Sequence, residues 1–80
     1  MSNQHEIRVG RLYKHFKGTL YKVIGVAAHT ETGETMVVYH RADDASQLWV
    51  RPMDMFLSEV DHEKYPDVTQ KMRFELVIPE

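Results

Sequence analysis

The sequence has no cysteine, one tryptophan, three prolines and four glycines among its 80 residues. Without cysteine the chain cannot form disulfides, bind zinc through thiolates or use a cysteine nucleophile. No apolar run approaches the ~20 residues that span a bilayer, and residues 1–10 are too polar for a signal peptide. We therefore expect a soluble protein of the cytoplasm.

The length of the chain limits how much structure it can build. A chain of this size buries roughly 63% of its unfolded surface on folding, which allows one modest core. Neither a second domain nor a large internal active site fits. We expect a flexible N-terminal segment over residues 1–9 and a single domain over residues 10–80.

Charge is unevenly distributed along a chain whose net charge is -2. Five basic residues occur between Arg8 and Lys22 with no acid among them, whereas Asp54 to Asp67 contains five acids and one lysine. A basic stretch can mark contact with nucleic acid. Lysines on strand edges also discourage aggregation, and modules that bind nucleic acid usually carry a net positive charge. Both interpretations remain open.

Short apolar segments separated by turn residues predict strands. Residues 10–16 and 19–29 flank Lys17-Gly18, where glycine can adopt the positive φ that a two-residue hairpin turn requires. This turn predicts Leu12 opposite Val23. It places Tyr13 and His15 on one face of the hairpin, and Leu12, Phe16, Tyr21 and Val23 on the other.

Further turn and strand signals follow along the chain. Pro52 is expected to stop the preceding strand, because proline has no ladder donor, and to begin a helical turn. The fold predicted is mainly β: a small, SH3-like, partly open β-barrel of about five or six short strands with one short helical turn. Its remaining parts are a loop at 30–34, a strand at 35–41, a turn at 42–46, a strand at 48–51, the helical turn at 53–56, a loop at 60–69 and a closing strand at 74–78.

Several clusters together resemble one family. They begin with Tyr13-Lys14-His15-Phe16-Lys17-Gly18 and continue through His29-Thr30-Glu31-Thr32, Val37-Val38-Tyr39, Trp49-Val50-Arg51-Pro52, Met55-Phe56 and Arg73-Phe74. In this order and spacing they resemble the small bacterial and phage family known as domain of unknown function 1653. The resemblance implies a compact β-rich barrel and no established activity. The sequence departs from the family pattern after Tyr39, where the resemblance implies a further tyrosine.

Aromatic, histidine and basic residues concentrate in two of these clusters. Small barrels bind ligands at loops and sheet edges, where aromatic rings stack and Arg or Lys contacts an anion. We predict a binding module for an anionic or aromatic ligand: a nucleotide, a nucleic acid or a peptide. Tyr13 and Trp49 would provide stacking surfaces, Arg51 and Lys17 anion contacts, and His15 and His29 orienting donors. Tyr13 and Trp49 could equally belong to the core, because a small domain relies on few aromatics for burial.

Two alternatives come from other classes of protein. His29, Glu31 and Glu34 could converge in one loop as metal ligands or as the groups of a small hydrolase-like enzyme. No nucleophile elbow, phosphate loop or His-Glu-x-x-His spacing supports catalysis, so we lean away from an enzyme and expect no cofactor. The other alternative is a structural interaction domain, including a homodimer formed through an exposed edge strand.

Overall fold

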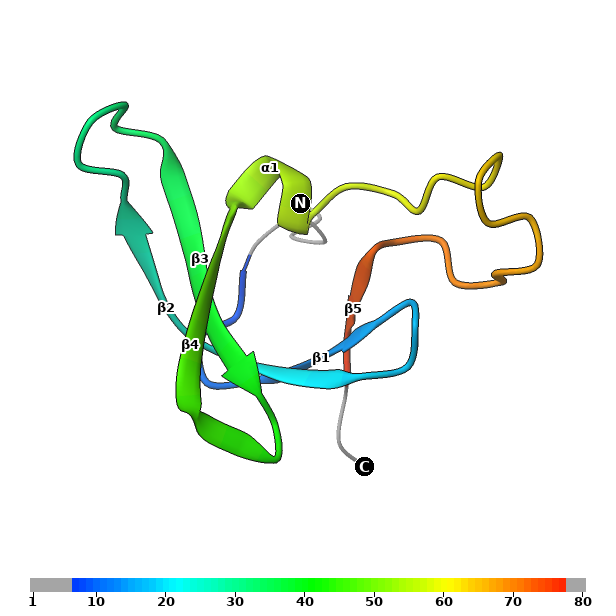
Figure 1. Ribbon diagram of the computed structural model, residues 1–80, viewed down its shortest axis with the longest axis horizontal. Coiled ribbons are helices and arrows are strands. Elements are labelled where there is room, and N and C mark those ends of the chain that lie inside the picture. Colours follow the sequence, from blue (N-terminus) through cyan, green and yellow to red (C-terminus); the bar gives the residue numbers. More distant parts are fainter. Residues whose placement is uncertain (1–6, 78–80) are drawn as a thin grey trace.

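A computed structural model describes residues 7–77 and contains one antiparallel sheet of five strands (Figure 1). The strand order across the sheet is β4-β3-β2-β1-β5, so consecutive strands are neighbours except for β5, which returns beside β1. One short helix follows β4 directly. The elements are β1 (Leu12–His15), β2 (Leu20–Ala28), β3 (Thr35–Arg41), β4 (Asp44–Pro52), α1 (Met53–Phe56) and β5 (Phe74–Leu76).

The first hairpin pairs in a different register from the one predicted. Tyr13 lies opposite Tyr21, one residue away from the expected pairing. The cause is a longer turn: the Gly18 N–H donates to the His15 carbonyl at 2.8 Å and the Lys17 N–H to His15 Nδ1 at 3.1 Å. A shift of one residue moves every side chain of a strand to the opposite face. The predicted register is therefore wrong, and Tyr13 and His15 share a face with Tyr21.

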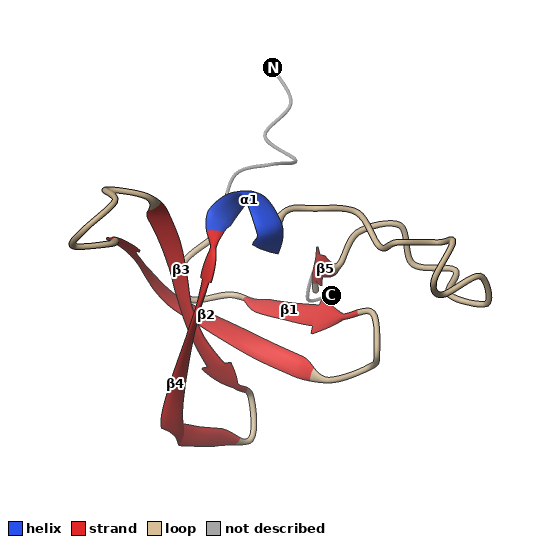
Figure 2. Ribbon diagram, turned by 45° about the horizontal axis from the view of Figure 1, so that its top comes forward, coloured by secondary structure: helices blue, strands red, loops and turns tan. Residues whose placement is uncertain are grey.

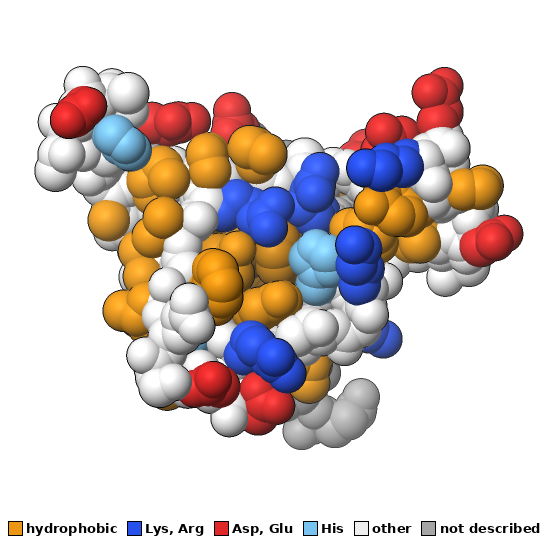
Figure 3. Space-filling model, in the orientation of Figure 1, with side chains coloured by type: hydrophobic (Ala, Val, Ile, Leu, Met, Phe, Trp, Pro, Cys, Tyr) orange, Lys and Arg blue, Asp and Glu red, His pale blue; other side chains and the backbone are white. Residues whose placement is uncertain are grey.

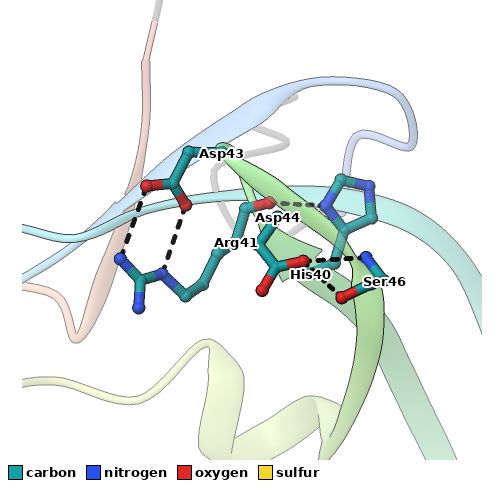
Figure 4. A network of polar contacts seen from close by, with 5 residues as sticks. All are labelled: His40, Arg41, Asp43, Asp44 and Ser46. Carbon is teal, nitrogen blue, oxygen red and sulfur yellow. Dashed lines mark hydrogen bonds and ion pairs between the residues drawn. The ribbon is translucent and has the colours of Figure 1, made fainter.

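The next two turns explain the lengths of β3 and β4. The β2–β3 hairpin opens at Ala28 and Thr35, as predicted from its polar, glycine-containing loop. The following turn is shorter than expected, because Arg41 already pairs with Asp44. Figure 4 shows how polar side chains stabilise it: Arg41 pairs with Asp43 at 3.3 Å, and Asp44 accepts hydrogen bonds from Ser46.

Proline ends β4 and begins the helix, as the sequence predicts. Pro52 occupies the position before α1 with φ -54° and ψ 140°, the extended geometry that leads into a first helical turn. The helix is one turn long and its backbone bond runs from the Leu57 N–H to the Met53 carbonyl. Its main contribution is Phe56, which is fully buried.

The core gathers on the face of the sheet that α1 covers. Phe56 stacks on Phe74 with ring centroids 4.0 Å apart and an angle of 6° between the rings. Tyr13 and Tyr39 meet the Phe56 ring edge-on at 5.3 and 5.5 Å. Such aromatic pairs contribute beyond their buried area, which matters in a domain this small. The buried cluster is Tyr13, Val23, Val37, Tyr39, Phe56 and Phe74.

The sheet is strongly curved but not closed, so the prediction is confirmed only in part. The mainly β fold, the five strands and the helical turn are present. The SH3-like barrel is not confirmed, because β4 and β5 are the two edges of an open sheet (Figure 2). A side chain spans the gap instead: the Arg51 guanidinium of β4 lies 5.5 Å from the centre of the Phe74 ring on β5.

Two predictions concern the ends of the chain. Within the segment predicted to be flexible, Ile7 packs against the core and the Arg8 N–H donates to the Tyr13 hydroxyl at 3.0 Å. Residues 1–6 and 78–80, including Ile78 of the predicted closing strand, lie outside the described residues. Between residues 7 and 77, no helix is long and apolar enough to cross a bilayer.

Candidate anion-binding pocket

The turn after β1 and the long loop between α1 and β5 lie against each other. Phe16 packs on Tyr65 with ring centroids 5.0 Å apart, and the Phe16 N–H donates to the Arg73 carbonyl at 3.0 Å. Gln70 Nε2 donates to the Lys14 carbonyl at 2.9 Å. A pocket of about 460 Å³ opens where these segments meet the end of β4. Its lining is His15, Phe16, Lys17, Tyr21, Arg51, Asp61, Lys64, Tyr65 and Arg73.

Two half-buried arginines line this pocket, and neutral hydroxyl groups hold both. Arg51 Nε donates to the Tyr39 hydroxyl at 3.2 Å, and Arg73 Nε donates to Ser58 Oγ at 3.0 Å. Each guanidinium is fixed through a single nitrogen, and its Nη groups make no hydrogen bond within residues 7–77. The arginines are thus oriented without losing their charge to a carboxylate.

Two lysines and two aromatic rings also line the pocket. Lys17 Nζ lies 5.5 Å from the centre of the Tyr65 ring and 5.9 Å from that of Phe16. Lys64 Nζ also lies 5.5 Å from the Tyr65 ring. These cation–π contacts restrain the ammonium groups and leave their charge in place.

The single acid in the lining is engaged elsewhere. Asp61 Oδ1 accepts hydrogen bonds from the backbone N–H groups of Glu63 and Lys64 at 3.1 and 3.3 Å, which closes a turn of its own loop. Residues 7–77 contain one ion pair within 4.0 Å, between Arg41 and Asp43, and it lies outside the pocket. The pocket therefore contains four cationic side chains and no carboxylate paired with any of them.

His15 also lines the pocket and is neutral at pH 7. Burial, followed by the charges of Arg51, Arg73 and Lys17 in that order, lowers the pKa of His15 from 6.5 to about 4. Its Nδ1 accepts the Lys17 N–H, so the proton of the neutral ring lies on Nε2. His15 can therefore donate one hydrogen bond from Nε2, and its ring packs edge-on against Phe74 at 4.9 Å.

Figure 3 shows the resulting surface. Lys and Arg side chains lie above and to the right of a histidine near the middle of this face, and hydrophobic side chains lie to its left. Acidic side chains lie toward the periphery of the same view. Positive charge is thus concentrated at one hollow of a chain whose overall charge is negative.

Comparison with known proteins places this chain in a family. A family model described as a protein of unknown function, DUF1653, matches residues 11–76. The chain belongs to this family. A crystal structure of a DUF1653 protein from Bordetella bronchiseptica is 29% identical, with a TM-score of 0.69 over 96% of this chain and 99% of that one. No curated protein matches. The resemblance drawn from the sequence is confirmed, and it carries no activity with it.

The fold brings three of the predicted ligand-binding residues of this DUF1653 domain together and separates the others. His15, Lys17 and Arg51 line the pocket. Tyr13 is 4% exposed, so its ring offers no stacking surface, and the prediction of one there is corrected. Trp49 is 45% exposed and lies outside the lining of this pocket.

His29 lies at the tip of the β2–β3 hairpin, on the opposite side of the molecule from the β1–β2 turn (Figures 1 and 2). Its Nδ1 accepts hydrogen bonds from the backbone N–H groups of Glu31 and Thr32 at 3.1 and 3.4 Å. Glu34 contributes its backbone N–H to Thr32 Oγ1 in the same loop. Residues 7–77 bring no three His, Asp or Glu side chains together as metal ligands. The loop is a hydrogen-bonded turn.

Sequence reasoning missed six of the nine residues that line the pocket. Arg73 appeared only as part of the family motif, and Lys64-Tyr65 only within the loop predicted at 60–69. Tyr65 carried a usable signal, because an aromatic residue in a long polar loop needs a packing partner, and here that partner is Phe16. Arg73 carried none, since its role depends on the position of Ser58.

Proposed function

We propose that this domain is a binding module that takes a small anionic ligand in the His15 pocket. One observation carries the proposal: four cationic side chains converge on one hollow with no carboxylate paired to them. Repulsion among like charges is costly, above all for the half-buried Arg51 and Arg73, and an anion would relieve it. Two of the four charges are also held in place before any ligand binds, which reduces the ordering cost of binding.

The distribution of charge favours a small ligand over a nucleic acid. Four of the ten basic and one of the twelve acidic side chains line the pocket, so the rest of the chain has six basic and eleven acidic residues, a net charge of -5. A polyanion needs an extended basic track and would be repelled by that surface. A nucleotide or another compact anion needs only the pocket.

The histidine tautomer favours binding over catalysis. A general base needs an unprotonated nitrogen facing the substrate. In His15, Nδ1 is occupied by the Lys17 N–H and Nε2 carries the proton. No carboxylate of residues 7–77 bonds the ring to orient it as a base. The ring is set up to donate a hydrogen bond to an anion.

A titration with small anions followed by amide NMR tests this function. Sulfate, orthophosphate, acetate and AMP would be added separately at low salt to the wild-type chain. We expect saturable shifts at His15, Lys17 and Arg51. The double variant Arg51→Met/Arg73→Met keeps the apolar stems and removes the two guanidinium charges, so it should lose the response.

The matched control removes a charge from outside the pocket. Lys22 is exposed on β2 and does not line the pocket, so Lys22→Met should bind like the wild type. Absence of saturable shifts with every anion would rule out the proposal. So would an equal loss in the Lys22→Met chain, because that would indicate a diffuse charge effect.

A homodimer is a second candidate, favoured by the outer edge of β4. Within residues 7–77 no strand pairs with that edge, and Leu48, Trp49 and Val50 are 45–60% exposed. An exposed apolar edge strand invites strand addition. We commit to a second copy of this chain, because Ala45 to Val50 carries no charge. Antiparallel pairing centred on Trp49 would place Leu48 opposite Val50 of the second copy.

Sedimentation velocity over a wide range of protein concentrations tests the dimer. A sedimentation coefficient that rises with concentration in the wild type and stays constant in Val50→Lys would support it. A monomer at every concentration would exclude it. The anion titration is independent of this result, because Val50 does not line the pocket.

A further inference from the structure

We infer that the ligand of the His15 pocket is a phosphate monoester, bound through its phosphoryl oxygens by Arg51, Arg73 and His15. This inference rests on the proposed function and narrows it to one chemical class. It follows from the number, type and position of the hydrogen-bond donors, and from the balance of charge in the pocket.

The pocket offers more hydrogen-bond donors than the two oxygens of a carboxylate can accept. Arg51 and Arg73 each keep their Nη groups after the Nε bond to a hydroxyl, and His15 adds the Nε2–H. Lys17 and Lys64 add two ammonium groups. A carboxylate has two oxygens, whereas a phosphate monoester has three terminal oxygens that are strong acceptors. Planar guanidinium groups also match phosphate geometry, since they donate two parallel hydrogen bonds.

The charge balance of the pocket also favours a phosphate monoester over a carboxylate. Four cationic side chains and Asp61 give the pocket an excess of three positive charges. A carboxylate cancels one of them, whereas a phosphate monoester carries about -1.5 to -2 at pH 7. The dianion therefore removes more of the repulsion among these side chains, two of which are already held in place.

A neutral histidine donor fits this role. Because Lys17 N–H holds Nδ1 as an acceptor, Nε2 presents its proton without adding a further charge to the pocket. His15 and Arg51 also pack on the same Phe74 ring, the histidine in a T-shaped pair and the guanidinium over the ring. The core thus positions two of the three phosphate donors together.

The size of the pocket indicates that the phosphate belongs to a larger molecule. A volume of about 460 Å³ lies in the range of pockets for organic ligands, roughly 300–1,000 Å³. Phe16 and Tyr65 provide the apolar wall on which such a body would rest. The rest of the ligand could be a nucleoside or a sugar, and these two sources are separated by the experiment.

Isothermal titration at low salt would compare AMP, ribose 5-phosphate, orthophosphate, adenosine and succinate. We expect both esters to bind at least ten-fold more tightly than succinate, and adenosine not to bind. AMP tighter than ribose 5-phosphate would identify a nucleotide site, and the reverse order a sugar phosphate site. Succinate binding as tightly as the esters would overturn the phosphate inference and leave the anion module standing. Binding by none of the anions would overturn both.

Variants connect the result to the named donors. Arg73→Lys keeps the charge and loses the paired donors, so we expect the affinity for the esters to fall about 10-fold or more. His15→Asn keeps an oxygen that can accept the Lys17 N–H and removes the Nε2–H, so it should also weaken ester binding. An Arg73→Lys chain that binds esters as well as the wild type would contradict the bidentate contact. Thermal denaturation of each variant checks that it is folded.

Discussion

The turns after β1 and after β2 both begin at a histidine whose Nδ1 accepts the backbone N–H two residues later, at 3.1 Å in each case. Both turns use a glycine with positive φ, Gly18 in the first and Gly33 in the second. Their surroundings differ completely. His15 lies against Phe74 and among unpaired cations, whereas His29 lies at an exposed tip (Figure 1).

This comparison shows that a local motif does not define a site. At His29 the hydrogen bond between the histidine and the following backbone only closes a turn. At His15 the same hydrogen bond holds a side chain that also lines a pocket. The difference is made by Arg51, Arg73 and Tyr65, which come from distant parts of the chain. The β3–β4 turn of Figure 4 shows the contrast for charge, since Arg41 is paired locally with Asp43, whereas the cations of the His15 pocket have no paired carboxylate.

We expect the largest difference in the free energy of unfolding lost when a residue packed against each turn is replaced. Phe74 contacts His15, Tyr21, Tyr39 and Phe56, so Phe74→Ala should lower the free energy of unfolding by about 3–5 kcal/mol. Thr32→Ala at the other turn removes one exposed hydrogen bond and should cost about 1 kcal/mol at most. Urea denaturation measures both.

Because Phe74→Ala could leave the chain unfolded, Phe74→Leu provides a milder version. It should destabilise the chain by less and still reduce the affinity for anions, since His15 and Arg51 both rest on the ring. Equal losses for Phe74→Ala and Thr32→Ala would contradict the comparison.

The second prediction separates the two histidines by ligand binding. His15→Asn should weaken binding of AMP about 10- to 100-fold, because a hydrogen bond to a charged group contributes about 1.5–3 kcal/mol. His29→Asn retains the same turn acceptor and should leave binding unchanged. Isothermal titration gives both constants. Comparable losses in the two variants would mean that the pocket is not the binding site.

The third prediction expects the two turns to behave alike. Gly18 and Gly33 have φ of +102° and +73°, and a Cβ added at either would meet no atom within 4 Å. Alanine should therefore cost about 1–2 kcal/mol at each position through backbone strain alone. Gly25→Ala is the matched control, because that position is equally open and its φ lies outside the strained range. A neutral Gly18→Ala would show that its turn can relax.

The fourth prediction is a pH dependence of stability at the pocket turn. The pKa of His15 is about 4 in the folded chain and about 6.5 in the unfolded chain. The unfolded chain therefore binds a proton below pH 6.5 that the folded chain does not take up until about pH 4. This contribution to stability is complete above pH 6.5 and is lost as the pH falls toward 4.

Calorimetry of the wild type and His15→Asn between pH 7 and pH 4 tests that sign. The melting temperature of the wild type should fall more steeply, because the variant lacks the group whose pKa is depressed. Other carboxyl and histidine groups titrate in both chains and cancel in the difference. Parallel curves would show that His15 has an ordinary pKa in the folded state.

Much of the fold was predictable because its signals are local. The polar loop with Gly33 gave the second hairpin, and Pro52 gave both the end of β4 and the start of α1. The first hairpin was predicted one residue out of register, because Lys17-Gly18 looked like a complete turn, whereas three residues separate His15 from its partner Thr19. That slip put Tyr13 on the face away from Val23, with which it shares the core.

Sequence alone determined the order of the elements, the second hairpin and the proline boundary between β4 and α1, since each depends on residues close together in the chain. It also identified the family, from clusters spread along most of the chain. It also marked His15, Lys17 and Arg51 as unusual. Only the curvature of the sheet and the docking of the α1–β5 loop decided that these three meet Arg73, Lys64 and Tyr65 at one hollow. Charges far apart in the chain become a site when packing holds them close and no carboxylate pairs with them, and that is a property of the folded chain.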